Sequence, residues 1–158
     1  MSITNDNILV GMDELAPLII ESIENNCEVK ITIKGNSMFP LLRHGRDRVK
    51  LNSVTDVKKY DIVLYRRDNG KYILHRIVKM NGDTLGIAGD NEQQIEYPIY
   101  KSQIIAIVTG FWRKGKYYEC DSMLHKIYSR IWLMILPKRR KALRILRKAN
   151  KIRRRLGL

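Results

Sequence analysis

Apolar residues recur at helical spacing near the N-terminus and then change to a period of two. Between positions 13 and 25, Leu15, Leu18, Ile19 and Ile23 have helical spacing, and acidic residues occupy the first turn. Over 29–34, Val, Ile and Ile alternate with Lys, Thr and Lys, which is the pattern of a strand with one buried face. The sequence therefore predicts a short amphipathic helix followed by a β-strand.

Further short apolar segments, separated by turn sequences, follow as far as residue 112. We expect strands at 48–51, 60–65, 72–79, 84–88 and 103–112. Asp68-Asn69-Gly70 and Asn81-Gly82-Asp83 are turn sequences that lead into the strands at 72–79 and 84–88. Several short strands with helices only at the ends of the chain predict an α+β protein that is mainly β.

The helical period returns after residue 121. One predicted face contains Met123, Leu124, Ile127, Tyr128, Ile131 and Ile135, and Pro137 ends this helix. A second helix follows, with an apolar stripe of Ala142, Ile145, Leu146, Ala149, Ile152 and Leu156 among basic residues. We therefore divide the chain into an N-terminal helix region (1–28), a β-rich domain (29–120) and a helical tail (121–158).

Positive charge is concentrated in that tail. The 158-residue chain has a net charge of +14, and residues 138–158 hold 11 of its 30 Lys and Arg residues and no acid. A basic amphipathic helix preceded by one with Tyr128 and Trp132 favours peripheral binding to an anionic membrane. A nucleic-acid-binding tail is the less favoured alternative, and a helix packed on the body with a free basic end is another.

Several protein classes are excluded by what the sequence lacks. Cys27 and Cys120 are too few and too far apart for a disulfide framework or a zinc site. No signal peptide is recognisable, and the longest purely apolar run, 131–136, is far below the roughly 20 residues of a spanning helix. We expect a cytoplasmic protein that uses no metal and no cofactor.

Ser37 and His75 are the candidates for chemistry. Ser37 lies in the turn sequence Gly35-Asn36-Ser37, and His75 shares the apolar face of its strand with Ile73 and Ile77. A serine hydroxyl is a weak nucleophile until a neighbouring base takes its proton, so the pair matters more than either residue. Taken singly, they are more typical of a turn serine and a core histidine.

A carboxylate that orients the histidine would complete such a site. Asp90 and Glu96 follow the histidine strand in a turn-rich stretch. A carboxylate bound to one ring nitrogen sets the tautomer and stabilises the imidazolium that forms during catalysis. Read singly, both acids are also typical of a solvated acidic loop.

Four segments, in order, resemble the S24/S26 serine peptidases, which include signal peptidase I and the LexA-like autopeptidases. Residues 35–42 (GNSMFPLL) are similar to the nucleophile box, and residues 60–63 (YDIV) resemble a Gly-Asp-Ile-Val strand with Tyr in place of Gly. Residues 75–78 (HRIV) resemble the histidine version found in endoplasmic-reticulum and spore-former signal peptidases, and Gly-Asp-Asn at 89–91 matches the last box. The resemblance covers about residues 29–110.

The resemblance implies a β-rich peptidase domain in which Ser37 is the nucleophile and His75 the general base. Glu96 matches the position of the orienting acid, and Asp90 ranks almost level with it. Met38 and Pro40, by default a core and a turn residue, would contribute to substrate binding beside the nucleophile. The oxyanion would be bound by the backbone N–H of the serine, because a glycine, residue 35, stands where signal peptidases add a serine hydroxyl.

The implied function is serine endopeptidase cleavage of a leader or signal segment from a peptide or protein precursor. A cytoplasmic precursor fits best, because an acidic helix stands where signal peptidases have a membrane-spanning segment. A LexA-like self-cleaving regulator is an alternative, although region 1–28 is too short for its helix-turn-helix domain and the one Ala-Gly bond is Ala88-Gly89. A catalytically dead binding module of the same fold is the third possibility.

Overall fold

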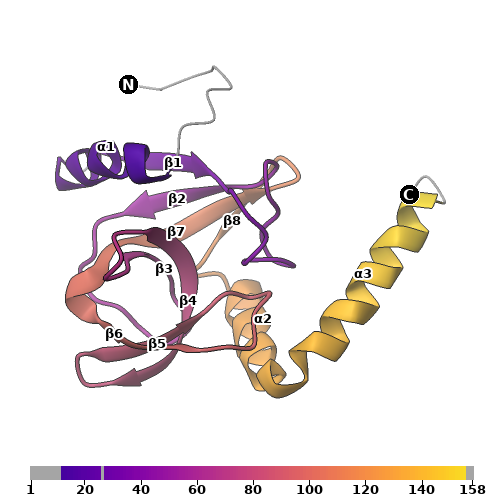
Figure 1. Ribbon diagram of the computed structural model, residues 1–158. Helices are drawn as coiled ribbons and strands as arrows, with labels where there is room; N and C mark the ends of the chain where they lie inside the picture. The colour runs from indigo at the N-terminus through magenta and orange to yellow at the C-terminus, as the bar shows by residue number, and fades with distance from the viewer. Residues whose placement is uncertain (1–11, 26, 156–158) are drawn as a thin grey trace.

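A computed structural model describes residues 12–25 and 27–155 of the chain (Figure 1). Leu156 of the predicted apolar stripe and most of the first half of region 1–28 lie outside these residues. The elements, in chain order, are α1 (Met12–Glu24), β1 (Val29–Thr32), β2 (Arg48–Asn52), β3 (Ile62–Arg66), β4 (Tyr72–Asn81), β5 (Thr84–Ala88), β6 (Glu96–Tyr100), the 3₁₀ turn η1 (Lys101–Gln103), β7 (Ile104–Arg113), β8 (Lys116–Glu119), α2 (Met123–Met134), the 3₁₀ turn η2 (Leu136–Lys138) and α3 (Arg139–Arg155).

Within the described residues, eight strands form one antiparallel sheet in the order β1-β2-β7-β3-β4-β5-β6, and β8 pairs with β7. The prediction of a mainly β protein with helices near its ends is confirmed. All the predicted strands are present, and the turns at 68–70 and 81–83 connect β3 to β4 and β4 to β5. The short strands β6 and β8 were not predicted.

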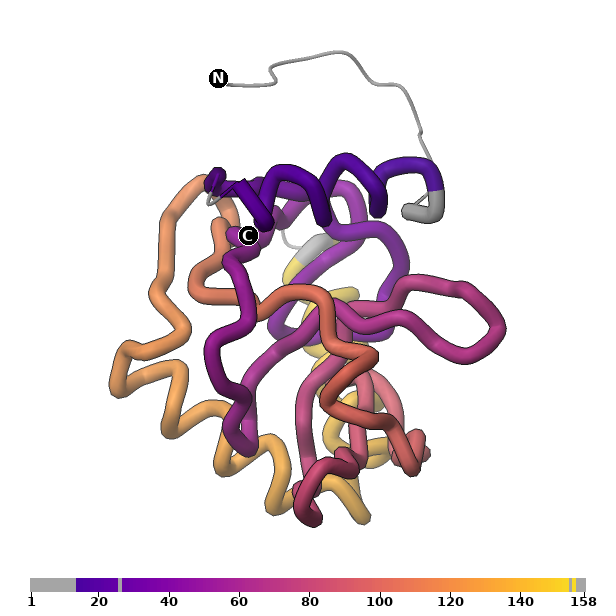
Figure 2. The backbone as a smooth tube through the Cα atoms, turned by 90° about the vertical axis from the view of Figure 1, so that its left-hand side faces the viewer, coloured from indigo at the N-terminus to yellow at the C-terminus, as the bar shows by residue number. Residues whose placement is uncertain are grey.

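Two clusters of apolar side chains fill the core, one on each side of the curved sheet. The central strand β3 supplies both clusters, because Ile62 and Leu64 face one and Val63 and Tyr65 face the other. This explains its uninterrupted apolar sequence. The α1 residues Ile19 and Ile23 belong to the first cluster, and the helix lies across the end of the body formed by β1 and β2 in both views (Figures 1 and 2).

The helix α2 packs against the body with a different face from the one predicted. Its buried residues are His125, Ser129 and Trp132, whereas most of its aliphatic residues are exposed, namely Met123, Leu124, Ile127, Ile131 and Met134. We expected Trp132 at a membrane boundary, and this is wrong, because the residue is 6% exposed and its indole N–H donates to the carbonyl oxygen of Asp90 at 2.9 Å. The reason is that a buried indole N–H needs an acceptor, which the loop after β5 supplies.

The last helix, α3, leaves the sheet body after η2 and runs beside it (Figure 1). Its N-terminal residue Arg139 is 1% exposed and Leu143 is 3% exposed, so this end is packed against the body. Ile145 and Ile152 are exposed. None of the helices in the described part of the chain is long and apolar enough to cross a membrane.

Candidate active site

Ser37 lies in the loop that connects β1 to β2. The loop turns at Gly35, whose φ of 81° lies in the left-handed region that favours glycine, and the Gly35 N–H donates to His44 Nδ1 at 2.9 Å. Met38, which directly follows Ser37, is 2% exposed and belongs to the first core cluster. Core packing of Met38 therefore fixes the position of Ser37, which is itself partly exposed.

The loop after β5 is held by a buried ion pair. Arg76 Nε and Nη2 donate to the two carboxylate oxygens of Asp90, each at 2.9 Å, and both side chains are 1% exposed. Arg76 Nη1 also donates to the Tyr60 carbonyl oxygen and to Ser129 Oγ, both at 2.8 Å. The ion pair with Arg76 thus fixes the position of this loop through Asp90. It makes no hydrogen bond to His75 among the described residues.

These two loops meet at Gly89. A Cβ atom added there would lie 2.6 Å from the Ser37 carbonyl oxygen, 3.1 Å from His75 Nε2 and 3.2 Å from the carboxyl carbon of Glu92. The structure therefore brings the two residues predicted to react, Ser37 and His75, to one small space that only glycine can border. The Asn91 N–H donates to the Ser37 carbonyl oxygen at 2.7 Å and holds the loops together.

His75 lies on β4, opposite Val63 of β3, and is 3% exposed. Burial lowers its pKa below the ordinary value of 6.5, and the negative charge of Glu92 acts in the opposite direction. Its Nε2 is 3.9 Å from Glu92 Oε1, and its buried Nδ1 has no hydrogen-bond partner among the described residues. The imidazole is therefore neutral at pH 7 and able to accept a proton.

The Ser37 hydroxyl and the Ser37 N–H make no hydrogen bonds within residues 12–25 and 27–155. Both groups are thus available to a substrate. The absence of a formed serine–histidine hydrogen bond is common in substrate-free sites, where such bonds tighten only when the substrate is bound.

Glu96, the other predicted orienting acid, lies elsewhere. It accepts a 2.8 Å hydrogen bond from the Tyr65 hydroxyl and pairs with Arg67 at 2.6 Å. Burial raises the pKa of Glu96, but the hydrogen bonds from Arg67 and Tyr65 and the charge of Arg67 together lower it below its ordinary value. Among the described carboxylates, the one paired with His75 is Glu92, which directly follows the Gly-Asp-Asn segment at 89–91 and was not proposed from the sequence as the orienting acid. Its place two residues after Asp90 is the signal that was available.

The helical tail completes the site, which the sequence did not predict. Arg139 Nη1 donates to the carbonyl oxygens of Gly89 and Glu92 at 2.9 and 2.7 Å. Two residues of α2 also contact Asp90. The Trp132 indole N–H donates to its carbonyl oxygen, and the Tyr128 hydroxyl donates to its carboxylate at 3.3 Å. Regions 29–120 and 121–158 are thus joined through the candidate site itself.

The residues predicted to bind substrate are placed differently. Met38 is a core residue, and Pro40 is partly buried in the same loop. Phe39, between them, lines a cleft that separates the loop from α3. The turn before β3 shows a further feature: Tyr60 has a φ of 84°, a conformation that favours glycine.

Comparison of the sequence with protein-family models and with curated proteins gives no match.

Proposed function

We propose that the protein is a serine endopeptidase with an S24/S26-like fold, in which Ser37 is the nucleophile and His75 the general base. The observation that carries the proposal is the approach of the Ser37 carbonyl oxygen, His75 Nε2 and the Glu92 carboxyl group to the same point beside Gly89. Tyr60 adds support, because its left-handed φ occurs at the position where the resembling peptidases have glycine.

The proposed reaction assigns one role to each of these groups. His75 Nε2 takes the proton of the Ser37 hydroxyl as Oγ attacks the carbonyl carbon of the scissile bond. The resulting oxyanion accepts a hydrogen bond from the Ser37 N–H, and the Glu92 carboxylate stabilises the imidazolium. The imidazolium then protonates the leaving amine as the C–N bond breaks. A water molecule, deprotonated by His75, hydrolyses the acyl-enzyme and releases the other product.

The substrate class that we propose is a peptide or protein precursor with a removable leader or signal segment. The self-cleaving alternative has less support, because Ala88 of the Ala88-Gly89 bond is 1% exposed and pairs with Arg76 inside the sheet. Cleavage there requires the end of β5 to leave the sheet.

The test is to incubate the full-length protein and Ser37→Ala with a diverse synthetic peptide library and to identify new termini by mass spectrometry. We expect cleavage at defined bonds by the wild-type protein and none by Ser37→Ala. A library that the wild-type protein leaves intact, under conditions where it is folded, would favour the binding-module alternative. Products that persist in Ser37→Ala would reject Ser37 as the nucleophile.

We also propose that the protein attaches peripherally to an anionic membrane surface, as presented by a cytoplasmic leaflet. The outer face of α2 carries Met123, Leu124 and Met134, which are 77–79% exposed, and α3 adds Ile145 and Ile152 at 67% and 57%. Aliphatic side chains exposed on neighbouring helices of a basic tail are typical of an interfacial anchor.

Point variants test this attachment better than truncation, because removing the tail would also remove Trp132 and Arg139 from the site. We expect Leu124→Ser combined with Met134→Ser to reduce co-sedimentation with anionic vesicles, and most clearly at high salt, where apolar burial remains. Leu18→Ser, which removes an equally apolar side chain that is 58% exposed on α1, is the matched control. Equal binding by all three proteins would reject the proposed contact.

A further inference from the structure

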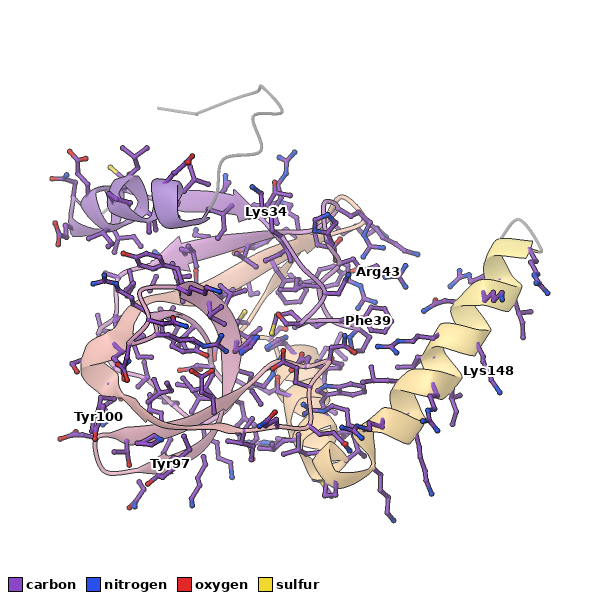
Figure 3. All side chains as sticks on the ribbon, viewed as in Figure 1. Lys34, Phe39, Arg43, Tyr97, Tyr100 and Lys148 are labelled. Carbon is purple, nitrogen blue, oxygen red and sulfur yellow. The ribbon has the colours of Figure 1, made fainter. Side chains whose placement is uncertain are left out.

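A cleft of about 700 Å³ lies between the Ser37 loop and α3. Asn36, Phe39 and Arg43 line it on the loop side, and Arg147, Lys151 and Arg155 line it on the helix side. Figure 3 shows Phe39 and Arg43 on the side of the body that faces α3. Asn36 and Phe39 come one residue before and two residues after Ser37 in the chain, so the cleft is lined by the loop that carries the proposed nucleophile.

The basic side chains that face the body continue along α3. Arg140, Arg144, Arg147, Lys151 and Arg155 are three or four residues apart and therefore share one face of the helix. A smaller hollow of about 340 Å³ is lined by Arg140, Arg144 and Arg147, with Asn91 opposite. Arg147 belongs to both hollows and donates to Asn91 Oδ1 at 2.9 Å. The basic face is thus pinned to the loop that borders the candidate site.

This face, defined by those five residues, has no acidic counterpart. No carboxylate lines either hollow, and none of the five cations forms an ion pair within the described residues. Like charges three or four residues apart destabilise a helix, and the cost increases where the charges border a cleft instead of bulk water. A negatively charged occupant would remove this repulsion.

We infer that the cleft binds an acidic segment of the peptide that is cleaved, an inference that rests on the proposed peptidase function. From Arg140 to Arg155 the helix rises by about 22 Å, which matches about seven residues of extended peptide. The Phe39 ring, over which Arg43 lies with its guanidinium carbon 5.5 Å from the centroid, offers an apolar surface at the nucleophile end. The substrate therefore carries its acidic residues outside the scissile bond, along α3.

The face that would meet a membrane is a different one. Ile145 and Ile152 are exposed, and Lys148 lies on the side of α3 turned away from the body (Figure 3). The basic face borders the protein's own cleft, where a lipid surface has no access while the apolar side chains contact the bilayer. A single peptide chain is the ligand that fits between the loop and the helix.

The test uses full-length Ser37→Ala protein, so that binding is measured without cleavage. Three fluorescent peptides of equal length and identical sequence, except for a seven-residue segment of Glu and Asp, of Gln and Asn, or of Lys, are titrated by anisotropy at physiological salt. We expect the acidic peptide to bind at least tenfold more tightly than the neutral one, and the basic peptide to bind least. Equal affinity for the acidic and neutral peptides would overturn the inference.

Two variants of equal charge change locate the site. Lys151→Glu with Arg155→Glu reverses charge in the cleft, whereas Lys148→Glu with Arg153→Glu reverses the same charge on residues that do not line it. We expect at least a tenfold loss of acidic-peptide affinity in the first pair and less than a twofold change in the second. Equal losses in both pairs, or displacement of the peptide by duplex DNA or anionic vesicles at lower concentration than by unlabelled acidic peptide, would overturn it.

Binding and cleavage separate the two proposals. Loss of selective acidic-peptide binding, with peptide cleavage by the wild-type protein retained, rejects the cleft and leaves the peptidase. Selective binding without any cleavage by the wild-type protein rejects the peptidase on which the inference rests.

Discussion

The backbone N–H of Asn91 donates a 2.7 Å hydrogen bond to the carbonyl oxygen of Ser37. This bond joins the loop after β1 to the loop after β5, which are far apart in the sequence. The buried pair of Arg76 and Asp90 fixes one of these loops, and Met38 anchors the other in the core. Residues outside the proposed catalytic pair thus determine how the Ser37 loop lies relative to the loop beside His75.

Replacement of Gly89 by alanine should remove most of the activity. The added Cβ would lie 2.6 Å from a backbone oxygen, that of Ser37, so the loops must separate. We expect kcat/KM on a cleaved peptide to fall at least a hundredfold, since displacement of a reacting group by about 1 Å has an effect of that size. Gly86→Ala is the control for crowding alone: its Cβ would lie 3.0 Å from Ile95 Cγ2 and 3.1 Å from Lys79 Cβ, which are side-chain atoms outside the site, so it should retain much more of the turnover. Normal activity in Gly89→Ala would contradict the geometry.

The pH dependence of cleavage should identify the acid that assists His75. Burial lowers the pKa of His75, so the acid limb of the kcat/KM profile should have its half-point below pH 6.5. The Glu92 charge raises this pKa, and Glu92→Gln should therefore move the half-point to lower pH and reduce turnover.

Glu96→Gln provides the comparison, because Glu96 binds Tyr65 and Arg67 and acts on His75 only through its charge. We expect a smaller shift in this variant. A larger shift and a larger loss of turnover in Glu96→Gln than in Glu92→Gln would assign the orienting role to Glu96, as the resemblance implied.

Asp90→Ala should be among the most destabilising changes in the site. It leaves the guanidinium of Arg76 buried without its counter-ion, and loss of one member of a buried pair costs about 3–5 kcal/mol. The free energy of unfolding from urea denaturation measures this. Glu96→Ala breaks an ion pair whose side chains are about a third exposed, which contributes little, and removes the acceptor of the buried Tyr65 hydroxyl, so it should cost less, about 1–3 kcal/mol. Similar losses in the two variants would show that the buried pair does not hold the loop.

Mild acid should destabilise the protein through its buried histidines. Burial lowers the pKa of His125 to about 4, and that of His75 is also lowered, whereas both are near 6.5 in the unfolded chain. The unfolded state therefore binds more protons, so their contribution to stability is present above pH 6.5 and is lost as pH falls towards 4. We expect Tm to decrease between pH 7 and pH 4.5, and to decrease less in His125→Gln. A Tm that does not change between pH 7 and pH 4.5, or an equal decrease in His125→Gln, would contradict this account.

The sequence identified most strands, and the two residues that we propose to react, because their signals are local. Period-two alternation marked β1, and apolar runs between turn sequences marked β3, β4 and β7. The strand β6 was not predicted because it contains Pro98 and only one buried residue, Ile99. A proline is tolerated there because β6 lies at the edge of the sheet. All four residues of β8 are exposed, so burial gives its sequence no pattern.

The orienting acid and the role of the tail depend on contacts between distant segments. Glu92 and Glu96 both follow His75 in the sequence, and only the β5–β6 register shows that Glu96 turns to Tyr65. The basic residues of the tail suggested a separate electrostatic unit. Arg139 is buried and donates to the Gly89 carbonyl oxygen. Its sequence neighbourhood does not distinguish it from the exposed basic residues that follow.

The most direct test of the proposed mechanism is a double-mutant cycle of Ser37→Ala and His75→Ala, measured as kcat/KM on one cleaved peptide. Members of one catalytic unit are not additive. We predict that each single variant loses nearly all activity and that the double variant is hardly slower than either. Independent, multiplicative losses, or near-normal rates in His75→Ala, would contradict the serine–histidine pair.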